Sequence, residues 1–302
     1  KELNWMVIPL SENPCAAAQG ALAIECRSND NSTKEIIKSI SSFSSMSSIE
    51  EERKILQSYG GGCHQKIGSS VEVLETGLVK TTKGETEEGR NISKRFFVAN
   101  KENKTFFSDV SEMNYFPASR EEQSFFKRVN LQDTENELPK ITNKGIYVSR
   151  SNAIGESIKI DDSNIIWTSG VDTWISLAMK GFWVNGTSDS LGEKNSPGEN
   201  PFKDMDWLKV SHADAENHDI DIIATYKLEP LELKKRMQSC EYFYWMSASS
   251  FKLAIDTFPE ILTKKHSCGL GNTYDFINGM IPENTFPCLN YDSWLEQIKA
   301  NH

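Results

Sequence analysis

The chain has 302 residues and a formal net charge of −10 at pH 7, a length that suggests about two domains, each able to bury a core. The acidic balance, with an isoelectric point near 5.2, excludes nucleic acid and anionic membranes as expected partners. No run approaches the ~20 apolar residues of a transmembrane helix and no signal peptide opens the sequence, so we expect a cytoplasmic protein. Six cysteines, widely spread and without Cys-x-x-Cys pairs, predict reduced thiols.

The first 62 residues alternate short apolar runs with helix signals. The chain starts at Lys1 without methionine, and residues 5–9 already have a strand pattern, so we expect a chain entered part-way through a fold. We next expect a strand at 21–24 after the Gln19-Gly20 turn. A helix at 34–41, capped by Ser32 or Thr33, would place Ile36, Ile37 and Ile40 on one face. A serine-rich loop at 41–48 should follow, and then a helix that begins with the Ser48–Glu51 capping box and runs through Tyr59 to the glycines.

Residues 71–129 predict a small sheet closed by a helix. Strands at 71–74 and 78–82 are expected to pair around Gly77, and strands at 95–99 and 105–108 to pair with each other. A helix at 119–129 would then direct Phe125 and Phe126 inward. Residues 130–144 are polar and contain proline, which is typical of a linker.

The rest of the chain repeats a unit of apolar strand, small hydroxyl residues and helix. A strand at 145–150 opens this part, the strand at 165–170 leads into a helix at 171–179, and residues 242–250 lead into a helix at 251–255. Such units predict a parallel α/β sheet with backbone amides and hydroxyls gathered at the strand ends. The same hydroxyls also suit a purely structural role as helix caps.

Residues 60–68, Gly-Gly-Gly-Cys-His-Gln-Lys-Ile-Gly, place a nucleophilic thiol among glycines whose missing side chains leave room for a bulky covalent group. This segment resembles the cofactor-carrying loop of porphobilinogen deaminase (hydroxymethylbilane synthase). Residues 16–27, Ala-Ala-Ala-Gln-Gly-Ala-Leu-Ala-Ile-Glu-Cys-Arg, are similar to the segment that precedes the cofactor domain of that family, with Ala18 in place of its first glycine. The alternative for the glycine run is a helix C-cap and tight turn in which Cys63 is merely half-buried.

Four segments of the second part resemble uroporphyrinogen-III synthase. Ser149-Arg150 looks like the end of its opening strand, and Ala224-Thr-Tyr-Lys227 looks like its Val-Tyr motif. Residues 245–250 look like its Thr-Ser-Pro-Ser turn, with Ala248 replacing the proline, and residues 269–274 look like its Gly-Pro-Thr-Thr turn. Each match is short, and their order behind a deaminase-like segment is the stronger argument.

Together the resemblances imply an α/β protein, in which an α+β cofactor domain is followed by a parallel-sheet α/β synthase-like unit. The implied division is residues 1–27 as the truncated end of the first two deaminase domains, 28–129 as the cofactor-carrying domain, 130–144 as a linker and 145–302 as the synthase-like domain. In the deaminase family the catalytic aspartate and most carboxylate-binding arginines precede this region, so the isolated chain is not expected to consume porphobilinogen.

The resemblance also implies the chemistry of particular residues. Cys63, beside Gly61 and Gly62, would hold a dipyrromethane primer as a thioether once the upstream deaminase domains are present. Tyr226 would donate a proton to the departing hydroxyl when hydroxymethylbilane closes to uroporphyrinogen III, a step that needs no metal. Three further hydroxyls, expected to face a common cleft with Tyr226, would bind substrate carboxylates or serve as caps: Ser247, Ser249 and Thr273. The expected small-molecule partners are porphobilinogen and hydroxymethylbilane, and a monomer is expected.

Other site classes fit poorly. Gly269-x-Gly271 lacks the third glycine of a dinucleotide fingerprint, and Cys63-His64 and His266-Ser-Cys268 lack zinc-site spacing.

Two function classes stay open. The first is an enzyme, the C-terminal part of a fused deaminase and synthase. The second is a non-catalytic fragment that binds tetrapyrroles or completes a separate deaminase chain by supplying Cys63 and the strand at 21–24.

Overall fold

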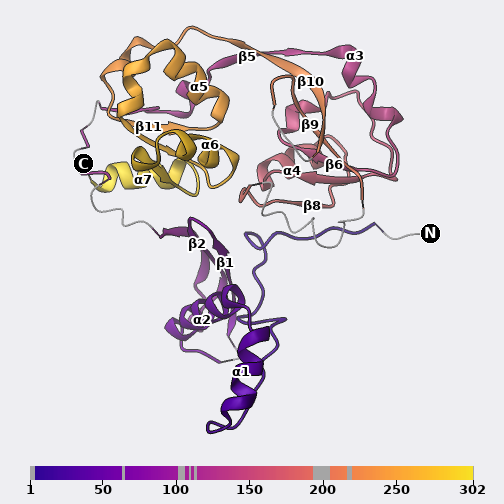
Figure 1. The fold of residues 1–302 in the computed structure, drawn as a ribbon. Coiled ribbons are helices and arrows are strands. Elements are labelled where there is room, and N and C mark those ends of the chain that lie inside the picture. The colour runs from indigo at the N-terminus through magenta and orange to yellow at the C-terminus, as the bar shows by residue number, and fades with distance from the viewer. Residues whose placement is uncertain are drawn as a thin grey trace. The chain divides into compact units, whose positions relative to one another are not determined.

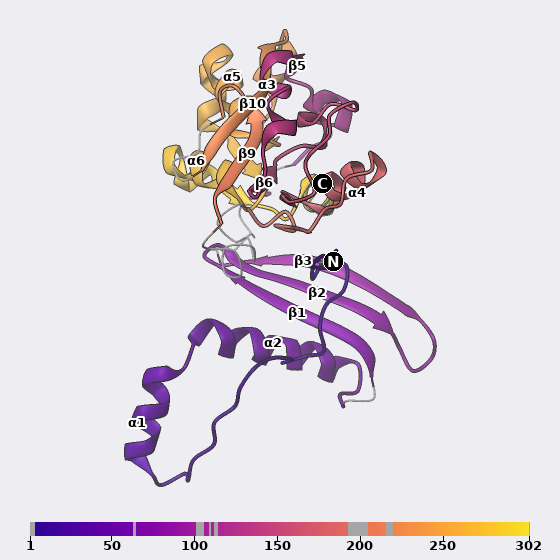
Figure 2. The ribbon, with the colours of Figure 1, turned by 90° about the vertical axis from the view of Figure 1, so that its right-hand side faces the viewer.

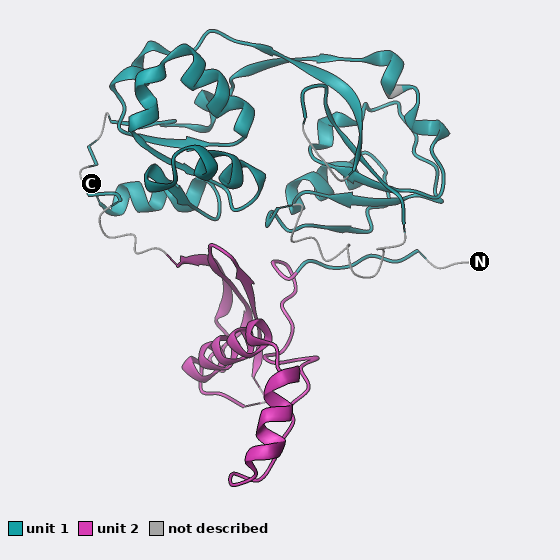
Figure 3. Ribbon diagram, viewed as in Figure 1, with its two compact units in different colours: residues 1–9, 103–302 teal, residues 10–102 magenta. Residues whose placement is uncertain are grey.

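A computed structural model describes residues 4–62, 65–100, 106–108, 110–111, 114–192, 205–215 and 220–301. The chain divides into two compact units (Figure 3). Unit 1 contains Lys1–Pro9 and Asn103–His302, and unit 2 is Leu10–Glu102. No helix among these described residues is long and apolar enough to cross a membrane.

Unit 2 is a three-stranded antiparallel sheet with two helices (Figure 2). In chain order its elements are α1 (Asn31–Ile40), α2 (Phe43–Ser58), β1 (Lys66–Leu74), β2 (Gly77–Glu85) and β3 (Asn91–Ala99). The strands lie in the order β1-β2-β3, and α2 runs along the sheet next to β1. Alternating apolar residues on one face form the core, namely Ile67, Val71, Val79 and Ile92. The predicted pairing of 71–74 with 78–82 around Gly77 is confirmed and extended.

The helices of unit 2 differ from the sequence expectation at their starts. The predicted helix at 34–41 is confirmed as α1, but its cap is Asp30, whose carboxylate accepts the Thr33 amide at 3.0 Å. The loop predicted at 41–48 is wrong, because Ser42 caps α2 through the Ser45 amide and the serines form its first turns. Several serines in this stretch could cap a helix, and the sequence pattern predicted Ser48, six residues after the observed cap Ser42.

The segment between Gln19 and α1 has no regular structure. The strand predicted at 21–24 is not formed, and residues 21–27 carry no strand or helix assignment. Ala18, which stands where the resemblance expects glycine, has a positive φ of 64°. An alanine in this region costs roughly 1 kcal/mol relative to glycine, which explains why glycine suits the position.

The larger sheet of unit 1 has six strands in the order β5-β10-β9-β6-β7-β8 (Figure 1). The strands are β5 (Phe126–Asn130), β6 (Gly145–Val148), β7 (Ile165–Thr168), β8 (Gly186–Thr187), β9 (Trp207–His212) and β10 (Asp221–Pro230). All neighbours pair in parallel except β5, which is antiparallel to β10. The helices α3 (Gln132–Glu135) and α4 (Val171–Met179) belong to this part, and α4 follows β7 as predicted.

The second sheet of unit 1 has four parallel strands in the order β13-β12-β11-β4. Its strands are β4 (Tyr115–Phe116), β11 (Tyr242–Trp245), β12 (Lys265–Cys268) and β13 (Thr285–Pro287). Helices α5 (Ala248–Thr257), α6 (Asn272–Met280) and α7 (Tyr291–Ala300) each follow one of these strands. Repeated strand–helix units with parallel pairing confirm the predicted α/β class for this region.

A two-stranded ribbon connects the two sheets of unit 1. Residues 126–130 of β5 pair antiparallel with residues 226–230 of β10. At one end Phe125 and Phe126 pack into the core of the four-stranded sheet. Toward the other end Tyr226 and Leu228 pack into the core of the six-stranded sheet. The chain therefore passes between the two sheets twice, once along each strand of this ribbon.

Residues 105–130 depart from the sequence expectation. The predicted helix at 119–129 is wrong, because a short 3-10 turn at Arg120–Gln123 is followed by β5. The partner that makes residues 126–130 a strand, β10, lies about a hundred residues later in the chain. The strand predicted at 105–108 is not formed at 106–108, which are a turn, and β3 pairs with β2; residue 105 lies outside the described residues. The two compact units divide at Glu102–Asn103, and the predicted domain bounds at 27, 129 and 144 stay predictions.

His266 lies fully buried in the core of the four-stranded sheet. Trp245 donates its indole N–H to His266 Nδ1 at 2.9 Å, and His266 Nε2 lies 2.9 Å from the Ile261 carbonyl oxygen. Because Nδ1 accepts, Nε2 carries the proton and donates to Ile261. Burial lowers the pKa of His266 to about 4, although the Ile261 carbonyl acts in the opposite direction.

We therefore expect the stability of the four-stranded part to fall in mild acid. The unfolded chain takes up this proton near pH 6.5, so the stabilisation is complete above that pH and is lost as the pH falls toward 4. Between pH 7 and pH 5 the free energy of unfolding should drop by about 2 kcal/mol from this group. Denaturant titrations followed by tryptophan fluorescence measure it. His266→Gln, which keeps one donor and one acceptor, should remove most of this slope; an unchanged slope would contradict the assignment.

Candidate functional site

The glycine run forms the end of α2. Gly60, Gly61 and Gly62 have φ angles of 103°, 69° and 96°, a conformation that favours glycine at all three positions. The amides of Gly60 and Gly61 close the helix by donating to Gln57 and Leu56 at 3.0 and 3.1 Å. A Cβ added at Gly61 would meet nothing closer than 3.9 Å. The loop therefore combines a helix end with a backbone that three glycines leave without side chains.

The predicted anchor, Cys63, lies outside the described residues together with His64. Its neighbours fix its place in the chain, because Gly62 ends the glycine run and β1 starts at Lys66. The predicted thiol thus belongs to a connection of a few residues between the end of α2 and β1. The roles of Cys63, Gly61 and Gly62 toward a cofactor stay predictions.

Tyr226 lies in β10 opposite His212, the last residue of β9, where the parallel register is irregular. Its side chain is 5% exposed, and its ring centroid lies 5.9 Å from that of His212. The guanidinium carbon of Arg128, on the neighbouring β5, lies 3.4 Å from the centre of the Tyr226 ring. A phenol, an imidazole and a guanidinium from three adjacent strands therefore meet at this point.

His212 is a candidate that the sequence analysis missed. Its Nδ1 is buried and has no hydrogen-bond partner within the described part of the chain. Burial lowers the pKa of His212, opposed by Asp214 and assisted by Lys209, so the imidazole is neutral at pH 7. The signal available in the sequence was a histidine two residues after the strand-like stretch Trp-Leu-Lys-Val at 207–210.

Serines follow three neighbouring strands on the same edge as His212. Ser149 follows β6, Ser169 follows β7 and Ser188 follows β8. Ser169 donates its hydroxyl to the Ser149 carbonyl at 2.8 Å. The hydroxyl oxygens of Ser149 and Ser188 are buried and find no partner among the described residues. Open α/β sheets bind ligands at the carboxyl ends of their strands, so this edge is suited to a polar ligand.

The other predicted substrate-binding residues lie at helix starts in the four-stranded part. Ser247 caps α5 by accepting the Ser250 amide at 3.2 Å, so its hydroxyl oxygen already serves as a helix cap. Ser249 lies in the first turn of α5 and Thr273 in the first turn of α6, both half-buried. The four predicted residues thus divide between two sheets, with Tyr226 on the six-stranded one. That they share one cleft stays a prediction.

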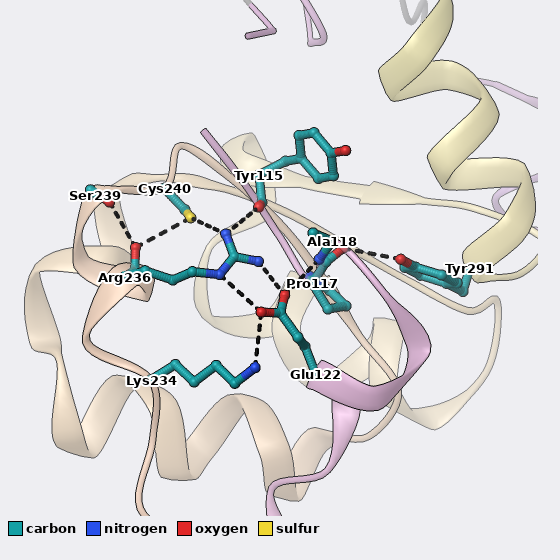
Figure 4. A network of polar contacts seen from close by, with 9 residues as sticks. All are labelled: Tyr115, Pro117, Ala118, Glu122, Lys234, Arg236, Ser239, Cys240 and Tyr291. Carbon is teal, nitrogen blue, oxygen red and sulfur yellow. Dashed lines mark hydrogen bonds and ion pairs between the residues drawn. The ribbon is translucent and has the colours of Figure 1, made fainter. Parts of the chain in front are cut away.

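A charged network fixes both strands of the ribbon near the four-stranded sheet (Figure 4). Glu122, just before β5, accepts from Lys234 Nζ and Arg236 Nε at 3.0 Å each, from a second Arg236 nitrogen and from the Ala118 amide at 2.8 Å. Arg236 also donates to the Tyr115 carbonyl at 3.2 Å. Burial raises the pKa of Glu122, but the bonds from Arg236, Ala118 and Lys234 outweigh it and hold the pKa at about 2.

We expect Glu122→Gln to lower the free energy of unfolding by about 2 kcal/mol, because the charge-assisted bonds from Arg236 are lost. The difference in unfolding free energy between the two proteins should disappear in acid. Because the pKa of Glu122 in the folded protein lies below the ordinary 4.5, the carboxylate stabilises the fold above pH 4.5, and this stabilisation is lost as the pH falls toward 2. Urea titrations of both proteins measure it. The exposed neighbour Glu121 supplies the control, since Glu121→Gln should change stability by less than ~0.5 kcal/mol; equal effects would refute the role of the network.

Metal ligation has no support in the described part of the chain, where no group of three or more His, Cys, Asp or Glu side chains could hold an ion. The thiols of Cys268 and Cys288 are buried, and burial raises the pKa of both, to about 12 for Cys288. Cys15 and Cys26 are exposed and free.

Comparison with known proteins finds similarity to two families. The chain is 39% identical over 79 residues to porphobilinogen deaminase from Fusobacterium nucleatum, which is 26% of each protein. Deaminases from Desulforamulus reducens and Nostoc sp. are 31% and 32% identical over 86 and 88 residues. The chain thus spans about a quarter of the length of these curated relatives. No family model matches.

Two solved structures of uroporphyrinogen III synthase from Thermus thermophilus resemble the chain over 59% and 58% of its length and cover 87% and 86% of the synthase. Their sequence identities are 9% and 10%, and their TM-scores are 0.41 and 0.33. At these scores neither match establishes a shared fold by itself.

Proposed function

We propose that the chain acts in tetrapyrrole biosynthesis. Its unit 2 would carry the cofactor-anchoring loop of a porphobilinogen deaminase, and its unit 1 would close hydroxymethylbilane to uroporphyrinogen III. The observation that carries the proposal is the 39% identity to a deaminase over 79 residues, a length comparable with unit 2. The deaminase-like motifs at 16–27 and 60–68 both fall in that unit.

The glycine loop fits the covalent group that a deaminase carries. Three successive glycines at positive φ leave the backbone before Cys63 without side chains, and a Cβ at Gly61 would meet only the Gln57 Cα, at 3.9 Å. Dipyrromethane would supply the primer onto which porphobilinogen units are joined. In this chain Cys63 would hold it as a thioether, and Gly61 and Gly62 would let it lie against the backbone. Cys63 would act as an anchor and not as the acid or base.

The proposed cyclisation centre is the edge of the six-stranded sheet at Tyr226. The hydroxyl of hydroxymethylbilane must leave as water, which a positioned proton donor assists. Tyr226 would donate to this oxygen, and the neutral His212 imidazole beside it would take part in restoring the phenol proton. The hydroxyls of Ser149 and Ser188, which have no hydrogen-bond partner among the described residues, would bind carboxylates of the linear tetrapyrrole together with Ser249 and Thr273. Ser247 would contribute mainly as the cap of α5.

The consumption of freshly made hydroxymethylbilane by the purified chain tests this proposal. We expect faster ring closure than in buffer alone, with a rate that rises in proportion to protein concentration and saturates with substrate. A rate equal to the spontaneous one, from protein that unfolds cooperatively, would contradict the catalytic proposal.

A non-catalytic alternative is favoured by one observation, the short span of the deaminase match. The chain would then bind a tetrapyrrole, or complete a deaminase, without closing the ring itself. Protein that binds the linear tetrapyrrole stoichiometrically but leaves its rate of closure unchanged would support this alternative. A monomer in the cytoplasm, with the two small molecules as partners, is part of the main proposal.

A further inference from the structure

A β-bulge sets the direction of the Tyr226 side chain. In the parallel pairing of β10 with β9, consecutive residues of β9 lie opposite Ala224 and Tyr226, so Thr225 is an extra residue of β10. Thr225 is buried, and its hydroxyl donates to the Ala153 carbonyl at 2.6 Å. A bulge re-aims a neighbouring side chain and is common next to active sites. The hydrogen bond from Thr225 to Ala153 therefore fixes the bulge that aims Tyr226.

The Tyr226 ring meets side chains from both strands that flank β10. Arg128 of β5 places its guanidinium carbon 3.4 Å from the ring centre, which is within the range of a cation–π interaction. The His212 imidazole of β9 lies 5.9 Å away, centre to centre, with 54° between the two ring planes. Arg128 is half-buried, and a cation–π contact is stronger where water is excluded. The guanidinium is thus the closer of the two groups and restricts how the ring can lie.

The pairing of the ribbon strands brings Arg128 to this place. In the antiparallel register of β5 and β10, Arg128 lies opposite Leu228 and Asn130 lies opposite Tyr226. Arg128 and Tyr226 are therefore diagonal neighbours on one side of the ribbon, a separation that long and aromatic side chains can span. Lys127, the preceding residue of β5, points to the other side and is exposed. Of these two neighbouring cations, Arg128 is the one that reaches the ring.

We propose that Arg128 is a positioning residue for ring closure, whose guanidinium holds the Tyr226 ring so that the phenol hydroxyl is directed at the departing hydroxyl of hydroxymethylbilane. The inference rests on the proposed function. A proton donor must come within hydrogen-bond reach of the atom it protonates, about 2.6–3.2 Å between the two oxygens. A ring that is free to rock spends less time at that distance, so a contact on its face raises the rate of closure without touching the substrate.

Kinetics and nuclear magnetic resonance of the full chain together test this role. Arg128→Met keeps a long side chain and removes the cation. We expect kcat for the closure of hydroxymethylbilane to fall about tenfold, the loss expected for one desolvated cation–π contact, while KM changes by less than about twofold. Arg128→Lys restores a cation and should recover most of the lost rate.

The resonance measurement needs no substrate. The ring carbon that bears the Tyr226 hydroxyl is observed in isotopically labelled protein, and its signal is identified by its absence in Tyr226→Phe. We expect this signal to move in Arg128→Met and to return toward its wild-type position in Arg128→Lys. Thr225→Val keeps the shape of the side chain but loses the hydrogen bond to Ala153, and it should lower kcat in the same direction as Arg128→Met.

Lys127→Met is the matched control, because it removes the neighbouring cation from the opposite side of the ribbon. It should leave kcat, KM and the Tyr226 signal unchanged, and urea unfolding midpoints check that all variants fold. A rise in KM alone, equal effects of Arg128→Met and Lys127→Met, or an unmoved Tyr226 signal in Arg128→Met would overturn the positioning role. A wild-type chain that closes no ring, but whose Tyr226 signal moves only in Arg128→Met, would count against the proposed function and not against the contact that holds the ring.

Discussion

Replacing Cys63 by serine should abolish attachment of dipyrromethane when the part of a porphobilinogen deaminase that this chain does not match is supplied. A serine oxygen is a far weaker nucleophile than a thiolate and would not form the thioether. Intact-mass measurement of the chain, after incubation with that part and porphobilinogen, reads the result directly. The wild-type chain should gain the mass of the primer, and Cys63→Ser should gain none. Without the added part the wild-type thiol should stay free.

Two other thiols provide controls for this experiment. Cys15 and Cys26 are exposed and unpaired, so either could react with an electrophilic pyrrole without any binding site. Cys15→Ser and Cys26→Ser should keep the full mass gain. An adduct that survives in Cys63→Ser, or that disappears in one of these controls, would place the cofactor elsewhere.

Tyr226→Phe should slow the enzymatic closure of hydroxymethylbilane by about 100-fold or more, the usual contribution of a positioned proton donor. The ring remains in the substituted protein, so its packing in the core and its contact with the Arg128 guanidinium are kept. Only the hydroxyl is removed. The rate of uroporphyrinogen III formation at saturating substrate measures the effect.

Ser249→Ala is the matched comparison for Tyr226→Phe. It removes one proposed hydroxyl contact to a substrate carboxylate and should reduce the rate by only about tenfold, mainly at low substrate concentration. Equal losses in the two variants would indicate that Tyr226 binds substrate and does not donate the proton. Unchanged rates in both variants would show that neither Tyr226 nor Ser249 belongs to the site.

Local sequence patterns predict the strand–helix units of unit 1 well. The residues at 165–179 form β7 and α4, and those at 242–257 form β11 and α5, because each has an apolar strand, a capping position and an apolar helix in immediate succession. The antiparallel pair around Gly77 is equally local. At that position a Cβ would come within 2.1 Å of the Val98 carbonyl oxygen, which explains why the turn requires glycine there.

Pairings between distant residues are not visible in such patterns. The run of residues 119–129 contains Phe125-Phe126 and charged neighbours, which suit either a helix or a strand. Its strand form depends on β10, and β10 also brings Tyr226 next to His212 of β9. The candidate site therefore contains a residue, His212, whose importance follows only from strand order. The start of α2 could not be predicted for another reason. Ser42 and Ser48 are equivalent as helix caps in the sequence, and only packing of the helix distinguishes them.

The isomer of uroporphyrinogen produced by the wild-type chain tests the central claim most directly. Spontaneous closure of hydroxymethylbilane gives the type I isomer, whereas closure with inversion of the last ring gives type III. Purified wild-type chain, free of host synthase, should convert freshly made hydroxymethylbilane mainly to type III, as resolved by chromatography of the oxidised products. Only type I from cooperatively folded protein would contradict the assignment of a tetrapyrrole cyclase.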